Sequence, residues 1–371
     1  MVEVLIIGGG LAGLVNAILL NRAGIGVLLV ERHHYPMHRV CGEYVSAEVS
    51  PFLQRHGLYP DHLELPIIRK LILTSVSGRK AETPLDQGGF GISRYAFDEF
   101  LYRIALREGV RFLLDTQVTG VRFLDNRFEV ELSDHSTVEA ELVIGAQGKR
   151  SKLDSALERK FMAERTDYIG VKYHIRTDFH VDSVALHNFS GGYCGLSGVE
   201  GGIYNLCYLG RRSQLRHYGT VPELERNVLW RNPFLRDIFS NSEFLFDKPL
   251  VINEFSFSPK KPVERNILMS GDAAGLITPL CGNGMALAIH SAALLSTLIA
   301  SWKRDSHRER ARLEERYRRE WINTFAPRLW VGRRLQGLFG GETTSTVAVD
   351  MLRYSPPLAH AIIRRTHGRP F

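Results

Sequence analysis

The sequence has few cysteines, and no two of them lie close together. Its 371 residues contain four, Cys41, Cys194, Cys207 and Cys281. A zinc site needs closely paired ligands and a disulfide-stabilised domain needs a high density of cysteine, so this spacing disfavours both. We therefore expect free thiols and a protein of the reducing cytoplasm.

Apolar runs that would indicate a targeting or membrane segment are also lacking. Residues 4–20 start with no basic leader and contain three successive glycines, which makes a signal peptide a poor match. Residues 284–302 approach the length of a membrane span, but they contain His290 and four serine or threonine residues. A buried helix explains this second stretch better.

The chain is longer than one hydrophobic core usually supports, and 44% of its residues are hydrophobic. Two domains or one elaborated α/β domain are therefore expected. The net charge is +7, and from Trp302 to the end there are 15 Lys and Arg against seven Asp and Glu. The tail thus carries the whole excess, an asymmetry that is typical of a surface meeting an anionic partner.

Glycines recur near the N-terminus in the stretch LIIGGGLAGL. Gly8, Gly10 and Gly13 have the spacing G-x-G-x-x-G, between an apolar strand at residues 3–7 and a predicted helix at residues 11–22. Such glycines permit a tight turn, close approach of the backbone to a pyrophosphate, and close packing of helix on strand. The unpaired N–H groups at the start of the helix attract phosphates.

The stretch GVLLVER predicts a second buried strand directly after this helix. Glu31 lies at its end, 18 residues past Gly13, where a carboxylate accepts hydrogen bonds from ribose hydroxyls. Strand, turn, helix, strand and acid occur in the right order. The sequence therefore predicts a dinucleotide-binding βαβ unit.

A second glycine-rich stretch, GDAAGLITPLCGNGM at residues 271–285, follows a predicted strand at residues 265–270. FAD, unlike NAD, ends in a ribityl chain and a flavin ring that need contacts far along the sequence. Asp272 suits the ribityl hydroxyls, and the helix after the turn suits the electron-rich edge of a reduced flavin. A plain loop with a helix cap is the alternative for this stretch alone, but the two stretches together favour FAD.

Five stretches in this order resemble the FAD-dependent oxidoreductases of the p-hydroxybenzoate hydroxylase fold, in the branch of geranylgeranyl reductases and flavin-dependent halogenases and monooxygenases. They are GGGLAGL with Glu31, RVCGEYVS at 39–46, ISRYAFDEFL at 92–101, LVIGAQGKRS at 142–151, and GDAAGLITPLCGNGM. The resemblance implies an α/β fold: a Rossmann-like FAD-binding domain of the glutathione-reductase type, with an inserted, mostly β substrate domain and a helical C-terminus.

The resemblance also implies domain boundaries. The discontinuous FAD-binding domain would comprise residues 1–67, 91–160 and 264–305, the substrate domain residues 68–90 and 161–263, and the helical C-terminal extension residues 306–371. The substrate pocket would then come from the second of these units.

Site residues follow from the resemblance, position by position, and all of them would contact FAD. Gly8, Gly10, Leu11, Ala12 and Gly13 would hold the pyrophosphate, Glu31 the adenosine ribose, and the backbone of Val118 the adenine. Arg39 and Arg94 would lie along the cofactor, Asp272 would bind the ribityl chain, and Gly282, Gly284 and Met285 would lie next to the flavin ring.

Three departures from the family patterns bear on the reaction. Gln147 in GAQG stands where hydroxylases of this fold commonly have Asp, in a segment associated with FAD and with the reducing nicotinamide, so NADH or NADPH is a possible but open choice of electron donor. The Trp-x-Trp-x-Ile-Pro motif of tryptophan halogenases is absent, which disfavours halogenation. There is no second G-x-G-x-x-G and hence no built-in nicotinamide domain.

The leading functional hypothesis is a monooxygenase that uses a flavin hydroperoxide to hydroxylate an aromatic or otherwise hydrophobic, lipophilic small molecule in a dry pocket. An ene-reductase of the geranylgeranyl reductase type and a non-catalytic FAD-binding protein are the alternatives. Cys41, in a segment that resembles the cysteine-glycine segment of those reductases, is a weak catalytic candidate, although a small structural thiol explains it equally well.

The sequence leaves the roles of several other polar side chains undecided. His174, His187 and Tyr193 are candidates for the pocket, and the strand IYNLCYL places Tyr204, Leu206 and Tyr208 on one face and Asn205 and Cys207 on the other. His33, His34 and His38 lack the accompanying ligands of a metal site, so we expect no metal.

Residues 306–326 predict a charged amphipathic helix, because Leu313, Tyr317, Trp321 and Phe325 recur every four residues. Its apolar face packs on the FAD domain, which we favour, or the basic tail rests on an anionic membrane surface and brings the enzyme to a lipophilic substrate. No fold motif for nucleic-acid binding accompanies the basic residues, so no nucleic acid is expected as a partner.

Overall fold

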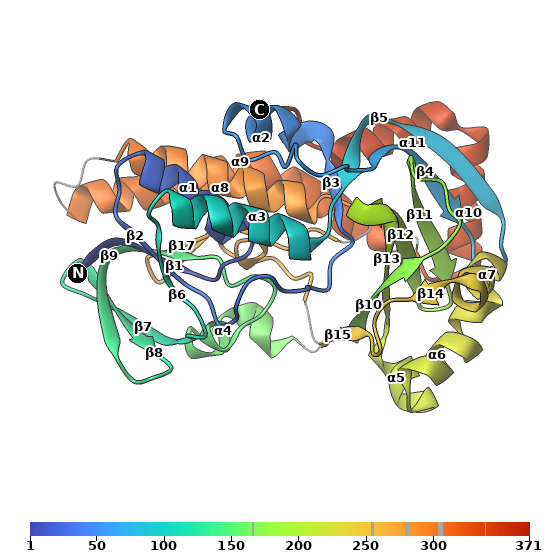
Figure 1. The fold of residues 1–371 in the computed structure, drawn as a ribbon, viewed down its shortest axis with the longest axis horizontal. Coiled ribbons are helices and arrows are strands. Elements are labelled where there is room, and N and C mark those ends of the chain that lie inside the picture. Colours follow the sequence, from blue (N-terminus) through green and yellow to red (C-terminus); the bar gives the residue numbers. More distant parts are fainter. Residues whose placement is uncertain (165–166, 254–255, 279–281, 303–306, 338) are drawn as a thin grey trace.

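The chain folds around two β-sheets, which lie side by side in the computed structural model (Figure 1). The structure describes residues 1–371 except 165–166, 254–255, 279–281, 303–306 and 338. The first sheet has the strand order β16 (Val263–Glu264), β17 (Ile267–Met269), β9 (Thr137–Gly145), β1 (Val2–Ile7), β2 (Val27–Val30) and β6 (Arg111–Leu113). Strand β8 (Arg127–Leu132) joins β9 and pairs with β7 (Val118–Leu124).

Parallel pairing defines the centre of the first sheet. Strand β1 is parallel to both β2 and β9, and β9 is parallel to β17. Because such strands are covered on both faces, they appear in the sequence as continuous apolar runs, as VLLV does in β2. The predicted strand, glycine turn, helix and strand at the N-terminus are thereby confirmed.

Helices cover one face of the first sheet (Figure 1). Helix α1 (Leu11–Arg22) contacts both α3 (Arg94–Arg107) and α8 (Gly284–Ala300), and α9 (His307–Gln336) packs on α8. Leu14 and Ile18 of α1 are fully buried against the strands. The apolar residues 284–302 thus form a buried helix, and among the described residues no helix combines the length and apolar character that crossing a bilayer demands.

The second sheet is mostly antiparallel. Its order is β14 (Glu243–Phe244), β10 (Tyr168–Arg176), β13 (Ile203–Arg211), β12 (Gly192–Val199), β11 (Ser183–Phe189), β4 (Ile67–Thr74), β5 (Lys80–Gly91) and β3 (Tyr44–Ser46), with β15 (Leu250–Asn253) paired to β10. A hairpin turn at Ser77 and Gly78 joins β4 to β5, and Gly78 has the positive φ of 84° that favours glycine.

Shorter elements complete the described chain. They are α2 (Ser50–Arg55), α4 (Lys152–Ala156), α5 (Arg212–Tyr218), α6 (Val221–Asn227), α7 (Pro233–Asn241), α10 (Glu342–Tyr354), α11 (Pro356–Thr366) and the single-turn helices η1 (Ala47–Val49), η2 (Lys160–Ala163), η3 (Glu200–Gly202), η4 (Leu229–Arg231) and η5 (Gly271–Ala273). Helices α5 to α7 cover one face of the second sheet, and α10 and α11 lie against β4 and β5 on the other.

Helix α9 runs further than the sequence predicted. Its four periodic apolar residues are buried in the core of the first sheet, which confirms that its apolar face packs within the protein. The helix continues through Pro327 to Gln336, because burial of Phe325 and Leu329 on either side of the proline offsets the lost backbone hydrogen bond. Trp330 remains exposed with the Arg334 guanidinium 5.2 Å from its ring, and membrane contact by this surface stays a prediction.

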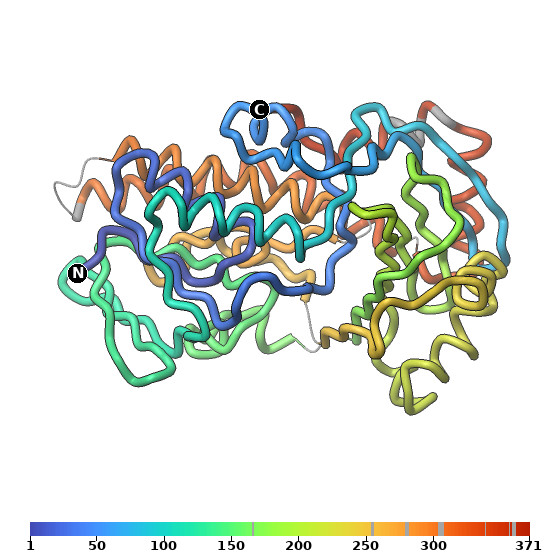
Figure 2. The backbone as a smooth tube through the Cα atoms, in the orientation of Figure 1, coloured from blue at the N-terminus to red at the C-terminus, as the bar shows by residue number. Residues whose placement is uncertain are grey.

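After α11 the C-terminal residues return to the helices that cover the first sheet (Figure 2). The Phe371 ring stacks on His290 of α8 at a centroid distance of 3.8 Å, and the backbone N–H of Gly368 donates to Glu48. Asn283, which precedes α8, donates to the carbonyl of Thr366 at 2.6 Å. The tail is therefore tied to the helix that follows the second glycine-rich stretch.

Glu225 of α6 places a carboxylate in the core behind the second sheet. Glu225 of α6 accepts hydrogen bonds from the hydroxyls of Tyr173 at 3.0 Å and Tyr208 at 2.9 Å, both on its Oε1 atom. Burial raises the pKa of Glu225 to about 7, although the two tyrosine hydrogen bonds oppose this change. Near neutral pH this group therefore ionises at a cost to the folded state.

We expect Glu225→Gln to remove a pH dependence of stability. A carboxyl whose folded pKa is raised stabilises the fold fully below its unfolded pKa, and this contribution is lost as the pH rises through about 7. The variant keeps an acceptor for both tyrosines, so relative to wild type it should gain about 2.5 kcal/mol of unfolding free energy between pH 5 and 8. Urea unfolding at several pH values measures this, with Glu223→Gln, an exposed carboxylate of the same helix, as control; parallel profiles for wild type and Glu225→Gln would contradict it.

Candidate functional site

A cavity of about 990 Å³ lies between the two sheets and joins the two glycine-rich stretches. One end is lined by the turn after β1 and the end of β2, and the middle by residues 39–44 and by the start of α8. The other end runs between the second sheet and helices α10 and α11. Segments from the whole length of the chain therefore line one cavity.

The first glycine turn is built for close backbone contacts. Gly8 has φ of 100°, and a Cβ atom there would lie 2.6 Å from the carbonyl oxygen of Ala146. A Cβ atom on Gly13 would lie 1.9 Å from the carbonyl oxygen of Gly8. Gly8, Gly10, Leu11 and Ala12 line the cavity, whereas Gly13 lies behind them and sets the packing of α1 on β1.

The start of α1 presents unpaired donors at this end of the cavity. Its N-cap residue, Gly10, provides no side-chain acceptor. The N–H groups of the first helical turn have no partner within the helix, and together with the helix dipole they favour an anion. The cradle therefore fits a pyrophosphate.

Glu31 lies at the same end, at the carboxyl end of β2. Its Oε2 atom accepts from the backbone N–H of Gly9 at 2.7 Å and from Arg39 at 3.2 Å. Val118, at the start of β7, lines the cavity near it, and the N–H of Thr116 donates to the Glu31 carbonyl at 3.1 Å. The residues assigned to adenosine are thus brought together.

Two arginines share one buried carboxylate along the middle of the cavity. Asp98 of α3 accepts from Arg94 at 2.7 and 2.6 Å and from Arg39 at 3.3 Å. Burial disfavours the charged arginine, but the Asp98 carboxylate outweighs it and holds the pKa of Arg94 above its usual value. Arg39 and Arg94 both line the cavity as fixed cations.

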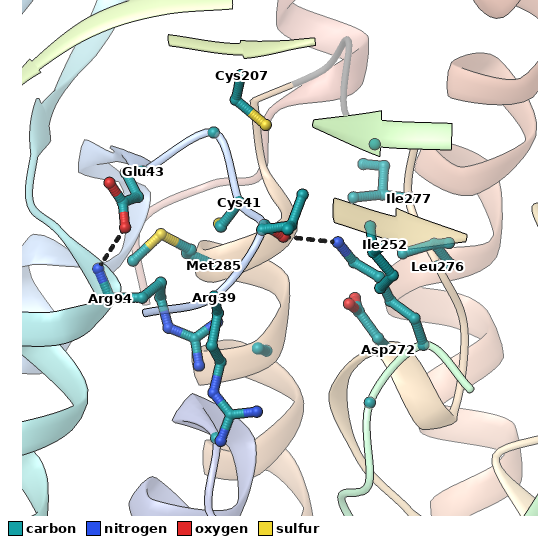
Figure 3. A pocket seen from close by; sticks show the side chains of 18 of the residues that line it. Arg39, Cys41, Glu43, Arg94, Cys207, Ile252, Asp272, Leu276, Ile277 and Met285 are labelled. Carbon is teal, nitrogen blue, oxygen red and sulfur yellow. Dashed lines mark hydrogen bonds between the residues drawn. The ribbon is translucent and has the colours of Figure 1, made fainter. Parts of the chain in front are cut away.

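The second glycine-rich stretch forms the opposite wall. Asp272, Gly282, Gly284 and Met285 line the cavity, and Figure 3 shows Asp272 and Met285 among the side chains around it. The backbone of Asp272 is fixed by Lys260, whose Nζ donates to its carbonyl oxygen at 2.8 Å. Cys281 lies outside the described residues.

Cys41 lies in the segment between these walls (Figure 3). It is half-buried, lines the cavity, and is a free cysteine like Cys194 and Cys207. A catalytic role for Cys41 stays a prediction. Among the described residues, no group of three or more His, Cys, Asp and Glu side chains is placed to hold a metal ion.

The structure decides which face of the second sheet meets the cavity. Tyr204, Leu206 and Tyr208 pack in the core under α5 to α7, so the Cys207 face is the one turned to the cavity. Tyr193 lines the cavity, whereas His187 is buried on the other face and stacks on Phe234.

An apolar arm extends the cavity away from the glycine turns. It is lined by the following residues of the second sheet and the C-terminal helices: Leu71, Leu73, Val184, Leu186, Leu209, Leu335, Phe339, Ala348, Met351, Leu352 and Ile363. The pocket was predicted within residues 68–90 and 161–263, and this prediction did not include the helical wall. The pattern that could have predicted this wall is an amphipathic helix that contains Ala348, Met351 and Leu352.

Comparison with known proteins agrees with this architecture. Residues 1–230 match the FAD_binding_3 family, described as FAD binding domain. Digeranylgeranylglycerophospholipid reductase 2 of Methanopyrus kandleri is 27% identical over 305 residues, which are 76% of this chain and 73% of that protein.

Two solved structures share the fold. The flavin-dependent brominase Bmp2 has a TM-score of 0.78 at 18% identity, covering 98% of this chain and 93% of its own. PqsL of Pseudomonas aeruginosa, a probable FAD-dependent monooxygenase, has a TM-score of 0.74 at 18% identity, covering 94% and 99%. With the nucleotide cradle and the family match together, the chain belongs to the FAD_binding_3 family and is an FAD-dependent oxidoreductase.

Proposed function

We propose that the protein is an FAD-dependent monooxygenase that hydroxylates an amphipathic small molecule, with an aromatic head and an apolar tail. The observation that supports this most is one continuous cavity, which joins the nucleotide cradle and the arginine-lined middle to an arm lined by aliphatic side chains. Bound FAD would supply the electrons that activate oxygen. The protein would position the substrate and keep water away from the reacting centre.

The residues divide these tasks by their place in the cavity. The start of α1 and Glu31 would hold the pyrophosphate and ribose, and Asp272 the ribityl chain. Arg39 and Arg94, held in place by Asp98, would lie along the cofactor with their guanidinium N–H groups turned to it. The arm would bind the tail by burying apolar surface, at about 25 cal/mol per Å².

A second candidate is the reduction of a carbon–carbon double bond in an isoprenoid-like substrate. The relative from Methanopyrus kandleri, a digeranylgeranylglycerophospholipid reductase by name, supports it over three quarters of this chain. An apolar arm suits either substrate. The two reactions differ in their need for oxygen.

Isotope labelling separates the two reactions. The FAD-loaded protein, reduced by NADPH, NADH or dithionite, is mixed with alkylphenols or polyprenyl compounds under ¹⁸O₂ or under nitrogen. We expect one ¹⁸O atom in the product and no conversion under nitrogen. A product that gains two hydrogens without oxygen would instead support the reductase. Comparing the three reductants shows whether a nicotinamide cofactor reduces the flavin, and hence whether the segment at Gln147 permits this reduction.

Narrowing the apolar arm is expected to shorten the tail that the enzyme accepts. Ala348 of α10 lines the arm, and phenylalanine there would fill it. Ala348→Phe should raise KM for long-chain substrates by about tenfold or more and leave short-chain substrates little changed, because only the long tail reaches it. Val347→Phe, on the exposed outer side of the same helix, is the matched control; equal effects on all chain lengths would speak against this orientation.

Glu31→Gln should weaken FAD binding without unfolding the protein. The amide still accepts from the N–H of Gly9, but it loses the charge that strengthens hydrogen bonds from ribose hydroxyls. We expect the FAD dissociation constant to rise about 10- to 100-fold, measured by flavin fluorescence. Glu139→Gln, an exposed residue of β9, serves as control, and unchanged affinity in Glu31→Gln would refute the assignment.

A further inference from the structure

The segment Arg39–Glu43, here called the Cys41 segment, is held from outside by side chains. Lys172 Nζ donates to the carbonyl oxygen of Arg39 at 3.1 Å, and Ser197 Oγ donates to that of Gly42 at 3.0 Å. Lys149 Nζ donates to the Val40 carbonyl oxygen at 3.1 Å. The segment is irregular in structure, so these bonds replace the backbone ladder that a strand or helix would have.

Lys172 also binds the side chain of Glu43, the last residue of the segment. It forms an ion pair with the Glu43 carboxylate, and both side chains are fully buried. The same carboxylate accepts from the backbone N–H of Arg94 at 2.7 Å and bonds His174 Nε2 at 2.7 Å. Although burial disfavours the anion, Lys172 and His174 lower the pKa of Glu43, so the carboxylate stays charged at neutral pH.

This arrangement connects the two sheets through the cavity wall. Lys172 and His174 belong to β10 of the second sheet, whereas Arg94 begins α3, which packs on the first. All five residues of the Cys41 segment line the cavity. Figure 3 shows Glu43 at Arg94 and Cys41 between Glu43 and the Asp272 wall.

The energetic cost of this ion pair indicates a role beyond stability. Removing two charges from water costs several kcal/mol per ion, and a well-packed apolar pair often serves the fold as well or better. Lys172 bonds both the first carbonyl and the last side chain of one short segment. These two bonds fix the position of that segment. An apolar residue in place of Lys172 would not fix it.

We propose that Lys172 and Glu43 are positioning residues that clamp the Cys41 segment in place as a fixed wall between the flavin region and the substrate arm. This inference rests on the proposed function for its catalytic meaning. Its structural content, that the ion pair holds the segment still, is testable without turnover.

The test compares Lys172→Met, Glu43→Gln and the double variant. Either single variant leaves an unpaired or weakened buried charge and should lower the melting temperature. The double variant carries no buried charge at this place and should recover most of the melting temperature. It still lacks the bond to the Arg39 carbonyl, so the segment should remain loose.

The mobility of the segment is measured by the rate at which iodoacetamide alkylates Cys41, followed by peptide mass spectrometry. In the double variant we expect Cys41 to react about tenfold faster or more than in wild type, since local opening exposes it. Cys194 on β12, fully buried on the other face of the second sheet, is the internal control for global opening and should react at its wild-type rate. Arg176→Met with Glu243→Gln, an exposed ion pair that also involves β10, is the matched variant control and should change neither thiol.

The outcomes separate this inference from the proposed function. A double variant with wild-type Cys41 reactivity would overturn the clamp, whatever reaction the enzyme performs. Faster Cys41 alkylation together with a raised KM in whichever reaction is found would support it. Failure of every substrate under ¹⁸O₂ and under nitrogen would count against the proposed function and leave the alkylation result standing.

Discussion

The arrangement of the cavity depends on the neutralisation of one buried carboxylate, Asp98. It is fully buried on α3 and accepts hydrogen bonds from Arg94, one turn earlier, and from Arg39, which is remote in sequence. A buried carboxylate without such partners would cost several kcal/mol. Satisfying Asp98 therefore fixes both arginines along the cavity, and Arg39 in turn contacts Glu31 at the nucleotide end.

Charge and apolar surface are thereby separated along one cavity. The first sheet, α1 and α3 contribute the arginine-lined, hydrogen-bonding end, where we propose that backbone groups and fixed dipoles hold the dinucleotide. The second sheet and the C-terminal helices contribute the aliphatic end. A substrate with a polar head and an apolar tail would have one favourable orientation in such a site, with its head at the flavin.

Local sequence patterns predicted the fold well where periodicity or glycine chemistry acts over short distances. The turn at Gly8 requires positive φ and leaves no room for a Cβ atom, so a glycine at this position by itself predicts a tight turn. The buried face of α9 followed from apolar residues every four positions. The end of α9 did not, because packing of Leu329 overrides the local tendency of Pro327 to end a helix.

The sequence by itself determined the βαβ unit, the acid at Glu31 and the presence of two glycine-rich stretches suited to one extended cofactor. Only the tertiary structure decided that Lys172 reaches the Cys41 segment, since a contact across 129 positions to Glu43 depends on the order of strands in the second sheet. Likewise, only the return of α10 and α11 to β5 made the tail part of the cavity. Short-range patterns encode which face of an element is buried, but they do not encode which distant element buries it.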